Sequence, residues 1–241
     1  MKVSIMQPAF MPWLGFFELI HQSELFIFLD DVQISPKSFQ IRNRIPSKEK
    51  NQNFTWITLH EAKNLPFNQR LLNNTFLLNA NRDFQLIREQ MTSNYEPGPK
   101  LDSFLNVFSE LLKHSQSIAD LNIGLIKFFC LEFQINTPFL KSSNLDLVGK
   151  KSDKVINILR AVEFSNYLAV PGSLDYMIPD EKWANLLPKV LKFNYTPQQY
   201  PQSGLTNFVP FMSIVDVYLN LKKDFAIETI HGGFKGSMPV I

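Results

Sequence analysis

The chain has little of several features that would mark a class of protein. Its 241 residues include a single cysteine, Cys130, so an internal disulfide is excluded and nothing favours an oxidising compartment. No apolar run approaches the ~20 residues that a membrane-spanning helix needs. Pro8 and Pro12 interrupt the apolar segment near the N-terminus. We therefore expect no signal peptide, no membrane span and a cytoplasmic location.

Charge of one sign is also lacking. The chain has 24 lysines and arginines against 22 aspartates and glutamates, for a net charge of +2, which gives no global electrostatic reason to bind DNA or a membrane surface. The four histidines, at positions 21, 60, 114 and 231, show no metal-ligand spacing. We expect no metal site.

What the chain does have is an alternation of strand and helix patterns. Apolar strands at Val3–Met6 and Leu25–Leu29 flank a helix at Leu14–His21, which predicts a right-handed parallel β–α–β unit. Alternating residues at Phe39–Ile45 and Phe54–Leu59 predict a β-hairpin.

Later segments extend this pattern. Helical spacing recurs between residues 66 and 133, at Asn68–Leu78, Arg82–Thr92, Lys100–His114 and Ile118–Phe133. Strands are then expected at Thr137–Ser143, Asn166–Val170 and Val190–Tyr195, and helices at Lys151–Val162, Asp180–Leu187 and Ser213–Leu221. The fold class is thus α/β, a three-layer Rossmann-like domain whose mostly parallel sheet carries a β-hairpin and a helical insertion. Residues 1–65 and 134–230 form its two halves, 66–133 form the insertion, and 231–241 form a tail that we expect to be flexible.

The first candidate site is the turn between the first strand and its helix. Gln7, Pro8, Pro12, Trp13 and Gly15 lie within nine positions, so the turn is rigid and holds both polar and aromatic groups. A Gln at a strand end can simply satisfy backbone groups. The functional interpretation is that the Gln7 amide orients a ligand while Trp13 forms a wall.

Two acidic residues end the second strand. Asp30 and Asp31, followed by Gln33, could act as a general base, a metal ligand or a ribose acceptor. The alternative is a cap or turn role for one of them. Adjacent side chains on an extended segment point apart, so we expect one of the two to face the site.

The hairpin carries basic residues. Arg42 and Arg44 share one face of an alternating strand while Asn43 takes the other, and Lys37 precedes them. Two guanidiniums on one face can clamp a phosphate or carboxylate, although a solvated charged face is the more common outcome.

Two further segments add candidates at strand ends. Ser142 and Ser143 end one strand, and Lys150 lies in a Gly-Lys-Lys-Ser segment that precedes a helix but lacks the glycine spacing of a P-loop. Ser152 of that segment is expected to act mainly as the helix N-cap. The last candidates, Tyr167, Gly172 and Tyr176, lie at another strand-to-helix junction. If the strands are parallel, these ends share one edge of the sheet.

Together, these segments resemble the WbqC-like family over about residues 3 to 222. The residues that carry the resemblance are Gln7-Pro8 with Pro12-Trp13-Leu-Gly-Phe-Phe17, Asp30-Asp31-Val-Gln33, Arg42-Asn43-Arg44, Ser142-Ser143, Tyr167 with Gly172 and Tyr176, and Phe208 to Asp216. The chain departs from the family pattern where Leu168-Ala-Val-Pro-Gly172 replaces Leu-Ser-Gly, and where a glycine-rich segment follows Thr229.

The resemblance implies a role in bacterial O-antigen or surface-polysaccharide biosynthesis. It implies an aminoacyl or acyl transferase, with glycine as one suggested group, that modifies the amino group of a nucleotide-linked amino sugar. The cofactor is left open; ATP or an activated acyl donor such as an aminoacyl-tRNA would fit. In this picture Trp13 and Tyr176 wall the sugar or base, Lys37, Arg42 and Arg44 hold phosphates, and Asp30 or Asp31 deprotonates the amine.

Other functions stay open from the sequence. The strand-end geometry also resembles ATP-dependent nucleotidyl transferases and ligases of the HIGH type, but the chain has no HIGH tetrad, so that likeness concerns architecture alone. A non-catalytic nucleotide-sugar-binding module and a plain α/β scaffold are the remaining alternatives.

Overall fold

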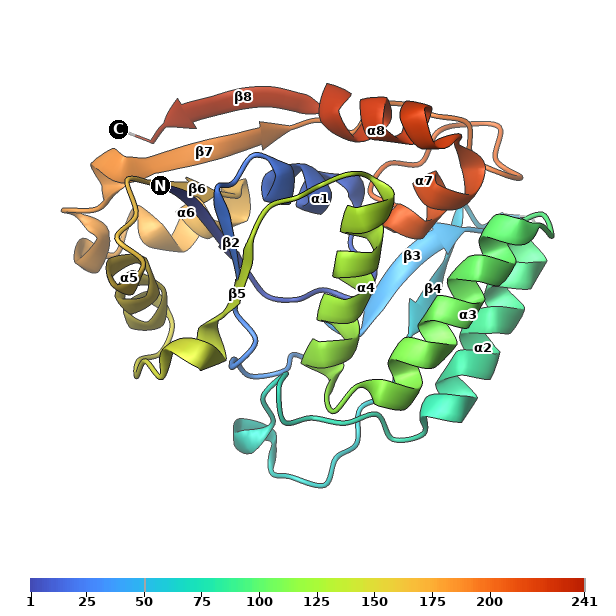
Figure 1. Cartoon of the computed structure of the whole chain (residues 1–241), viewed down its shortest axis with the longest axis horizontal. Coiled ribbons are helices and arrows are strands. Elements are labelled where there is room, and N and C mark those ends of the chain that lie inside the picture. The colour runs from blue at the N-terminus through green and yellow to red at the C-terminus, as the bar shows by residue number, and fades with distance from the viewer. Residues whose placement is uncertain (50, 241) are drawn as a thin grey trace.

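A six-stranded sheet forms the centre of the molecule (Figure 1). The structure, a computed structural model, describes residues 1–49 and 51–240. The strands lie in the order β5-β2-β1-β6-β7-β8. Their bounds are β1 Lys2–Met6, β2 Leu25–Phe28, β5 Phe139–Lys141, β6 Asn166–Ala169, β7 Val190–Tyr195 and β8 Phe234–Pro239. All neighbours are parallel except β7 and β8, so the sheet is mostly parallel, as the sequence predicts.

Helices cover both faces of this sheet. Their bounds are α1 Leu14–His21, α2 Ala80–Asn94, α3 Pro99–His114, α4 Ile118–Glu132, α5 Ser152–Ala161, α6 Pro171–Met177, α7 Ile214–Asn220 and α8 Lys223–Gly232. Phe26 and Phe28 of β2 pack in one core with α1 and α4, whereas Ile27 packs with Val3 and α5 in a second core. Two covered faces explain why β2 is a continuous apolar run.

The strand order creates a switch point. The chain moves from β1 through α1 to β2 and on to β5, then crosses by way of α5 to β6 on the other side of β1. The helix that follows β1 (α1) packs on one face of the sheet, and the helix that follows β6 (α6) packs on the other. Such a reversal leaves a crevice outside the carboxyl ends of the two strands. Ligands of doubly wound sheets bind at this position.

The hairpin and the helical insertion stand beside the sheet (Figure 1). Strands β3 Arg42–Pro46 and β4 Phe54–Thr58 pair antiparallel, with Arg44 opposite Trp56. Helices α2, α3 and α4 follow, close to the ranges expected for three of the four predicted helices. A group of stacked phenylalanines, among them Phe104 and Phe129, joins α3 to α4.

The fourth helix, expected at Asn68–Leu78, does not form. A single 3-10 turn, Phe67–Gln69, is followed by irregular chain that hydrogen-bonds to the segment after β2. The Ile34 amide donates to the Arg70 carbonyl, and the Leu72 amide donates to the Val32 carbonyl. These long-range partners replace the internal bonds of a helix. Asp180–Leu187 likewise forms 3-10 turns, Glu181–Trp183 and Leu187–Lys189, in place of the expected helix.

Most of residues 231–240, in the tail expected to be flexible, instead belong to a helix and a strand. Helix α8 contains His231, and β8 pairs with β7 along what would otherwise be an open sheet edge. The Tyr195 ring packs so closely on Gly233 that a Cβ there would lie 2.3 Å from it, so glycine is needed where β8 begins. Within the described residues, no helix combines the length and apolarity required to cross a membrane.

Candidate functional site

A cavity of about 500 Å³ opens beside the carboxyl end of β1. The first turn contributes Gln7 and Trp13 to its lining, and the segment that leads into the hairpin contributes Gln40, Asn43 and Arg44. We call it the main cavity. It lies at the strand end where the switch point predicts a ligand. It brings together five of the residues that the sequence singled out, namely Gln7, Pro12, Trp13, Asn43 and Arg44.

The amide of Gln7 is fixed in orientation. The Gln40 Nε2 donates to the Gln7 Oε1 at 2.7 Å, and the Gln40 Oε1 accepts from the Ser35 amide at 2.6 Å. Because a backbone N–H can only donate, this contact sets which end of Gln40 faces Gln7. Gln7 is exposed, and its Nε2 has no protein partner in the described part of the chain, so an oriented donor open to solvent lines the cavity.

Buried polar side chains hold the first turn in place. The Asn43 Nδ2 donates to the Phe10 and Met11 carbonyls at 3.1 and 2.8 Å. The Asn122 Nδ2 of α4 donates to the Pro8 and Gln40 carbonyls at 2.9 and 2.8 Å. Both the Nδ2 and the Oδ1 of Asn43 are hydrogen-bonded to backbone groups. Pro8 is buried and does not line the cavity. Asn122 was missed by sequence reasoning; a buried Asn within an apolar helix was its available signal.

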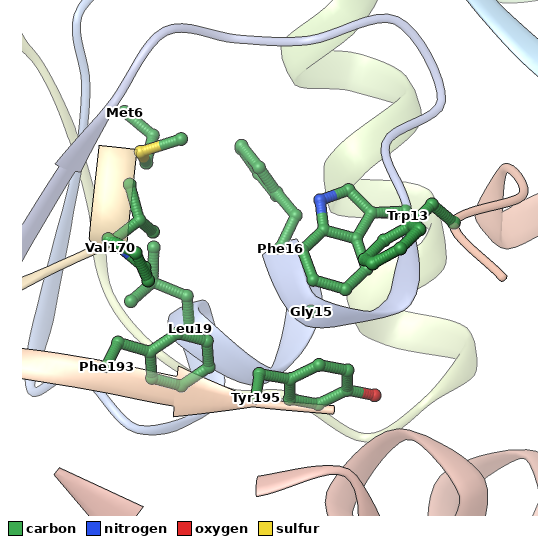
Figure 2. Close-up of a pocket in the computed structure, with 10 residues that line it drawn as sticks. Met6, Trp13, Gly15, Phe16, Leu19, Val170, Phe193 and Tyr195 are labelled. Atoms are coloured by element: carbon green, nitrogen blue, oxygen red, sulfur yellow. The ribbon is translucent and has the colours of Figure 1, made fainter. Parts of the chain in front are cut away.

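A second, apolar pocket of about 250 Å³ adjoins the main cavity (Figure 2), and Trp13 is one of four residues, with Met6, Phe16 and Phe211, that line both. This side pocket reaches from Met6 at the end of β1 to Val170 at the end of β6, so it occupies the switch point itself. A Cβ on Gly15 would lie 2.2 Å from the Trp13 ring, so the indole folds directly over the start of α1. The role of Gly15 is to allow this close approach.

The two hairpin arginines share one face, as predicted. The Arg42 guanidinium lies 4.1 Å from the centroid of Trp56, and that of Arg44 lies 5.0 Å from Phe54. Arg44 also donates from Nη2 to the Phe211 carbonyl at 3.2 Å. Partial burial lowers the pKa of Arg44 from its ordinary value, although the group remains charged at neutral pH. Neither guanidinium has a carboxylate within 4.0 Å among the described residues.

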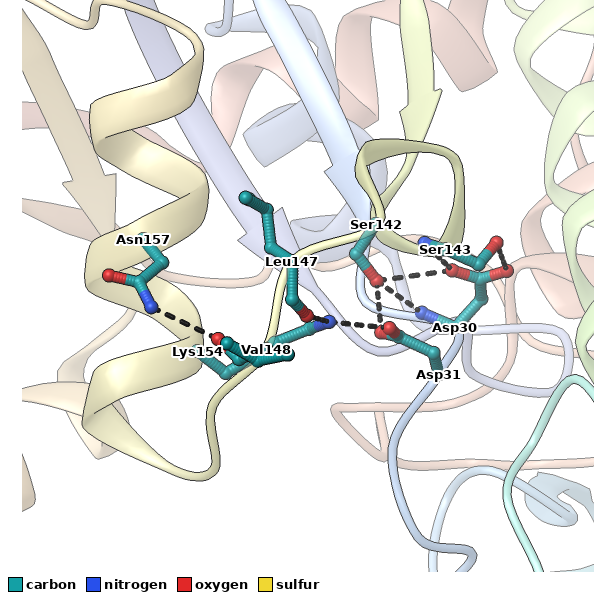
Figure 3. Close-up of polar contacts among 8 residues, drawn as sticks. All are labelled: Asp30, Asp31, Ser142, Ser143, Leu147, Val148, Lys154 and Asn157. Atoms are coloured by element: carbon teal, nitrogen blue, oxygen red, sulfur yellow. Dashed lines mark hydrogen bonds and ion pairs between the residues drawn. The ribbon is translucent and has the colours of Figure 1, made fainter.

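The two aspartates expected to be catalytic lie elsewhere. Asp30 is buried and accepts from the Ser143 amide at 3.0 Å and the Ser143 Oγ at 2.7 Å (Figure 3). Asp31 accepts from the Ser142 Oγ, and its other oxygen pairs with the Lys154 Nζ at 2.6 Å. Neither carboxylate lines the main cavity or the side pocket. Ser142 and Ser143 thus join Asp30 and Asp31, as their strand ends predict, but separately from Gln7.

The remaining predicted residues do not line the two cavities. Gln33 donates to the Phe67 carbonyl at 3.1 Å. Lys37 and Lys150 are exposed. Tyr167 is buried and stacks on Trp183.

Helix α6 holds the other two, Gly172 and Tyr176, both exposed. In the segment that departs from the family pattern, Val170 and Pro171 line the side pocket. Ser152 begins α5 but makes no N-cap hydrogen bond, because the capping position is Lys151.

A buried carboxylate lies in the Phe208 to Asp216 segment of the family resemblance, but the sequence did not predict it as a site residue. Asp216 of α7 accepts from the Tyr200 hydroxyl at 2.7 Å, the Tyr95 hydroxyl at 3.1 Å and the Gln202 Nε2 at 3.0 Å. Its Oδ1 also accepts from Asn220 at 2.6 Å. Burial raises the pKa of Asp216 to about 6, because these neutral donors offset only part of the desolvation of its charge.

The strand order defines a Rossmann-like α/β protein, and two adjoining cavities lie at the carboxyl end of β1. The chain belongs to the WbqC-like protein family, whose model matches residues 7–227. It is 23% identical over 222 residues to the uncharacterized protein Rv1507c of Mycobacterium tuberculosis, which covers 91% of this chain and 94% of that protein. No solved structure gives a significant match.

Proposed function

We propose that the protein transfers an aminoacyl or acyl group, such as glycine, to the amino group of a nucleotide-linked amino sugar. The observation that carries this proposal is the Gln7 amide, which presents an oriented Nε2 donor to the main cavity. Acyl transfer passes through a tetrahedral intermediate whose oxygen gains negative charge. A preorganised amide donor stabilises that charge without reorganising at the moment of reaction.

The lining of the cavities favours an activated donor. In the part of the chain that the structure describes, neither cavity is lined by a carboxylate, an imidazole or a thiol. An ester or thioester donor, such as an aminoacyl-tRNA, suits this lining. A neutral amine can attack the carbonyl carbon, and the departing alkoxide or thiolate takes up the proton that the amine loses. ATP-dependent adenylyl transfer is less well supported, because Asp30 and Asp31, which could hold its magnesium, are engaged by serines and Lys154.

The same lining favours a second candidate, a module that binds the nucleotide sugar without turnover. A binding site needs shape and oriented donors but no acid or base. This alternative and the transferase differ in turnover, and one assay separates them.

The test combines a substrate panel with a matched pair of variants. UDP- and dTDP-amino sugars are incubated with glycyl-tRNA, acyl thioesters, or glycine with ATP, and N-acylated sugar is sought by mass spectrometry. We expect Gln7→Leu to lower kcat by about 10²- to 10³-fold with little change in KM. The control Gln85→Leu alters an exposed glutamine on α2 and should have no effect. Binding without product from any donor would support the module, and full activity in Gln7→Leu would remove the assigned role.

A further inference from the structure

The outer face of the hairpin carries an unusual row of side chains. Phe39, Arg42, Arg44, Phe54 and Trp56 form this row, which we call the hairpin ladder. Phe39 and Phe54 each lie 6.0 Å from Trp56 between ring centroids. Arg42 stacks on Trp56, and Arg44 lies between Phe54 and Trp56 at 5.0 and 6.0 Å. Guanidinium and aromatic groups thus alternate along the face.

The ladder is continuous with the main cavity. Phe39 and Arg44 line the cavity and belong to the ladder as well. A ligand whose reactive end occupies the cavity would therefore pass Arg44 as it leaves. Phe39 is 52% exposed, so it offers an open ring face at this exit.

The two guanidiniums have donors to spare. No ion pair with Asp or Glu involves either arginine within the described residues, and the Nε atoms of both are covered yet unpaired. A guanidinium stacked on a ring is held by its face, which leaves the hydrogen-bond donors in its plane free for an anion. By contrast, Arg70 is engaged by Glu61 at 2.9 Å.

The arrangement of these groups suits a particular ligand. Arg42 and Arg44 are two apart on β3 and lie on one face, so two guanidiniums are available to the adjacent phosphates of a diphosphate. Aromatic faces stack nucleobases of any sequence. We propose that the hairpin ladder binds a nucleoside diphosphate, with the two phosphates on Arg42 and Arg44 and the base on Phe39. This inference rests on the proposed function for the group in the cavity, but nucleotide binding is testable by itself.

The test is calorimetric binding of UDP, UMP, uridine and inorganic pyrophosphate to the full chain. We expect UDP to bind more tightly than UMP, and UMP to bind more tightly than uridine. Arg42→Ala and Arg44→Ala should each weaken UDP about 10- to 100-fold. Phe39→Ala should weaken UDP about 10-fold while leaving pyrophosphate unchanged, because pyrophosphate has no base to stack. Arg88→Ala, an exposed arginine on α2, is the matched control.

Several outcomes would overturn the assignment. UDP affinity that is equal in the wild type and both arginine variants would do so, provided that thermal melts show all three folded. Binding of a five-nucleotide single-stranded RNA without detectable binding of UDP would assign the ladder to RNA instead. If UDP binds in the expected pattern but no acyl product forms, the ladder assignment stands and the transferase fails. If acylated sugar forms but UDP does not bind detectably, the transferase stands and the ladder assignment fails.

Discussion

Two regions at the same edge of the sheet treat their polar groups in opposite ways. Around Asp30, Asp31 and Lys154, hydrogen bonds and an ion pair engage every carboxylate. Around Gln7 and Arg44, the Gln7 Nε2 and the Arg44 Nε have no protein partner among the described residues, although the Arg44 Nη2 donates to the Phe211 carbonyl. Buried polar groups that are already paired stabilise a fold, whereas oriented groups without a partner mark a place for a ligand. Polar residue type alone does not separate these two roles.

The closed region should give the larger loss of stability when it is broken. Lys154→Ala leaves the Asp31 carboxylate, whose side chain is 18% exposed, without its cation. We expect the free energy of unfolding to fall by about 3 kcal/mol, measured by urea denaturation. Replacing both partners, Lys154→Met with Asp31→Leu, should recover much of that loss.

A surface ion pair is the matched control for this change. Lys182 and Asp153 are about half exposed and 2.7 Å apart, so Lys182→Ala should cost less than ~1 kcal/mol. Equal losses in Lys154→Ala and Lys182→Ala would mean that the cluster around Asp31 is not a structural core.

Asp216 sharpens the comparison, because its partners among the described residues are neutral donors and none of them is a cation. Burial raises its pKa from 3.8 to about 6 in the folded protein, so the folded state holds this proton more tightly than the unfolded state. The stability that this group contributes is complete below about pH 4 and is lost as the pH rises through 6. The loss amounts to about 3 kcal/mol at most.

The difference in unfolding free energy between the wild type and Asp216→Asn, followed from pH 4 to pH 7.5, isolates this group. The unfolding free energy of the variant should rise relative to that of the wild type as the pH rises. A pH-independent effect of the amide on stability would not alter this trend. A difference that does not vary with pH would show that Asp216 keeps an ordinary pKa.

The sequence predicted the features that depend on local signals. The prolines and glycine of the first turn, the alternation of the hairpin and the continuous apolar run of β2 each indicated the right element. Contacts between distant residues could not be predicted in this way. The Asn122 side chain holds a carbonyl 114 positions away, and the Ser213 hydroxyl holds the Met11 carbonyl 202 positions away.

The same limit applies to the two aspartates. Their place at a strand end was predictable, but the serines that engage them begin the 3-10 turn after β5 and the lysine lies in α5, more than 100 positions later. Sequence patterns place a residue at an edge of the sheet but do not predict which distant residue it contacts there. The predicted division of the chain at residues 65, 133 and 230 stays a prediction.

The smallest change tests the wall between the two cavities. Gly15→Ala places a methyl group 2.2 Å from the Trp13 ring, which must then rotate away from α1. Trp13 would lose its edge contacts with Tyr195 and Phe211, whose ring centroids lie 5.3 and 5.1 Å away. We expect a loss of about 1–3 kcal/mol and a changed near-ultraviolet circular dichroism spectrum.

Gly172→Ala provides the control for this prediction, since a Cβ at Gly172 in α6 meets no atom within 4 Å. That substitution should raise stability by up to ~1 kcal/mol and leave the aromatic spectrum unchanged, because alanine favours the helix. If Gly15→Ala behaved like Gly172→Ala, Trp13 would not be packed over α1, and the two cavities would form one space. The position of Trp13 between the two cavities depends on its close contact with Gly15, whereas several hydrogen bonds hold the closed region around Asp30.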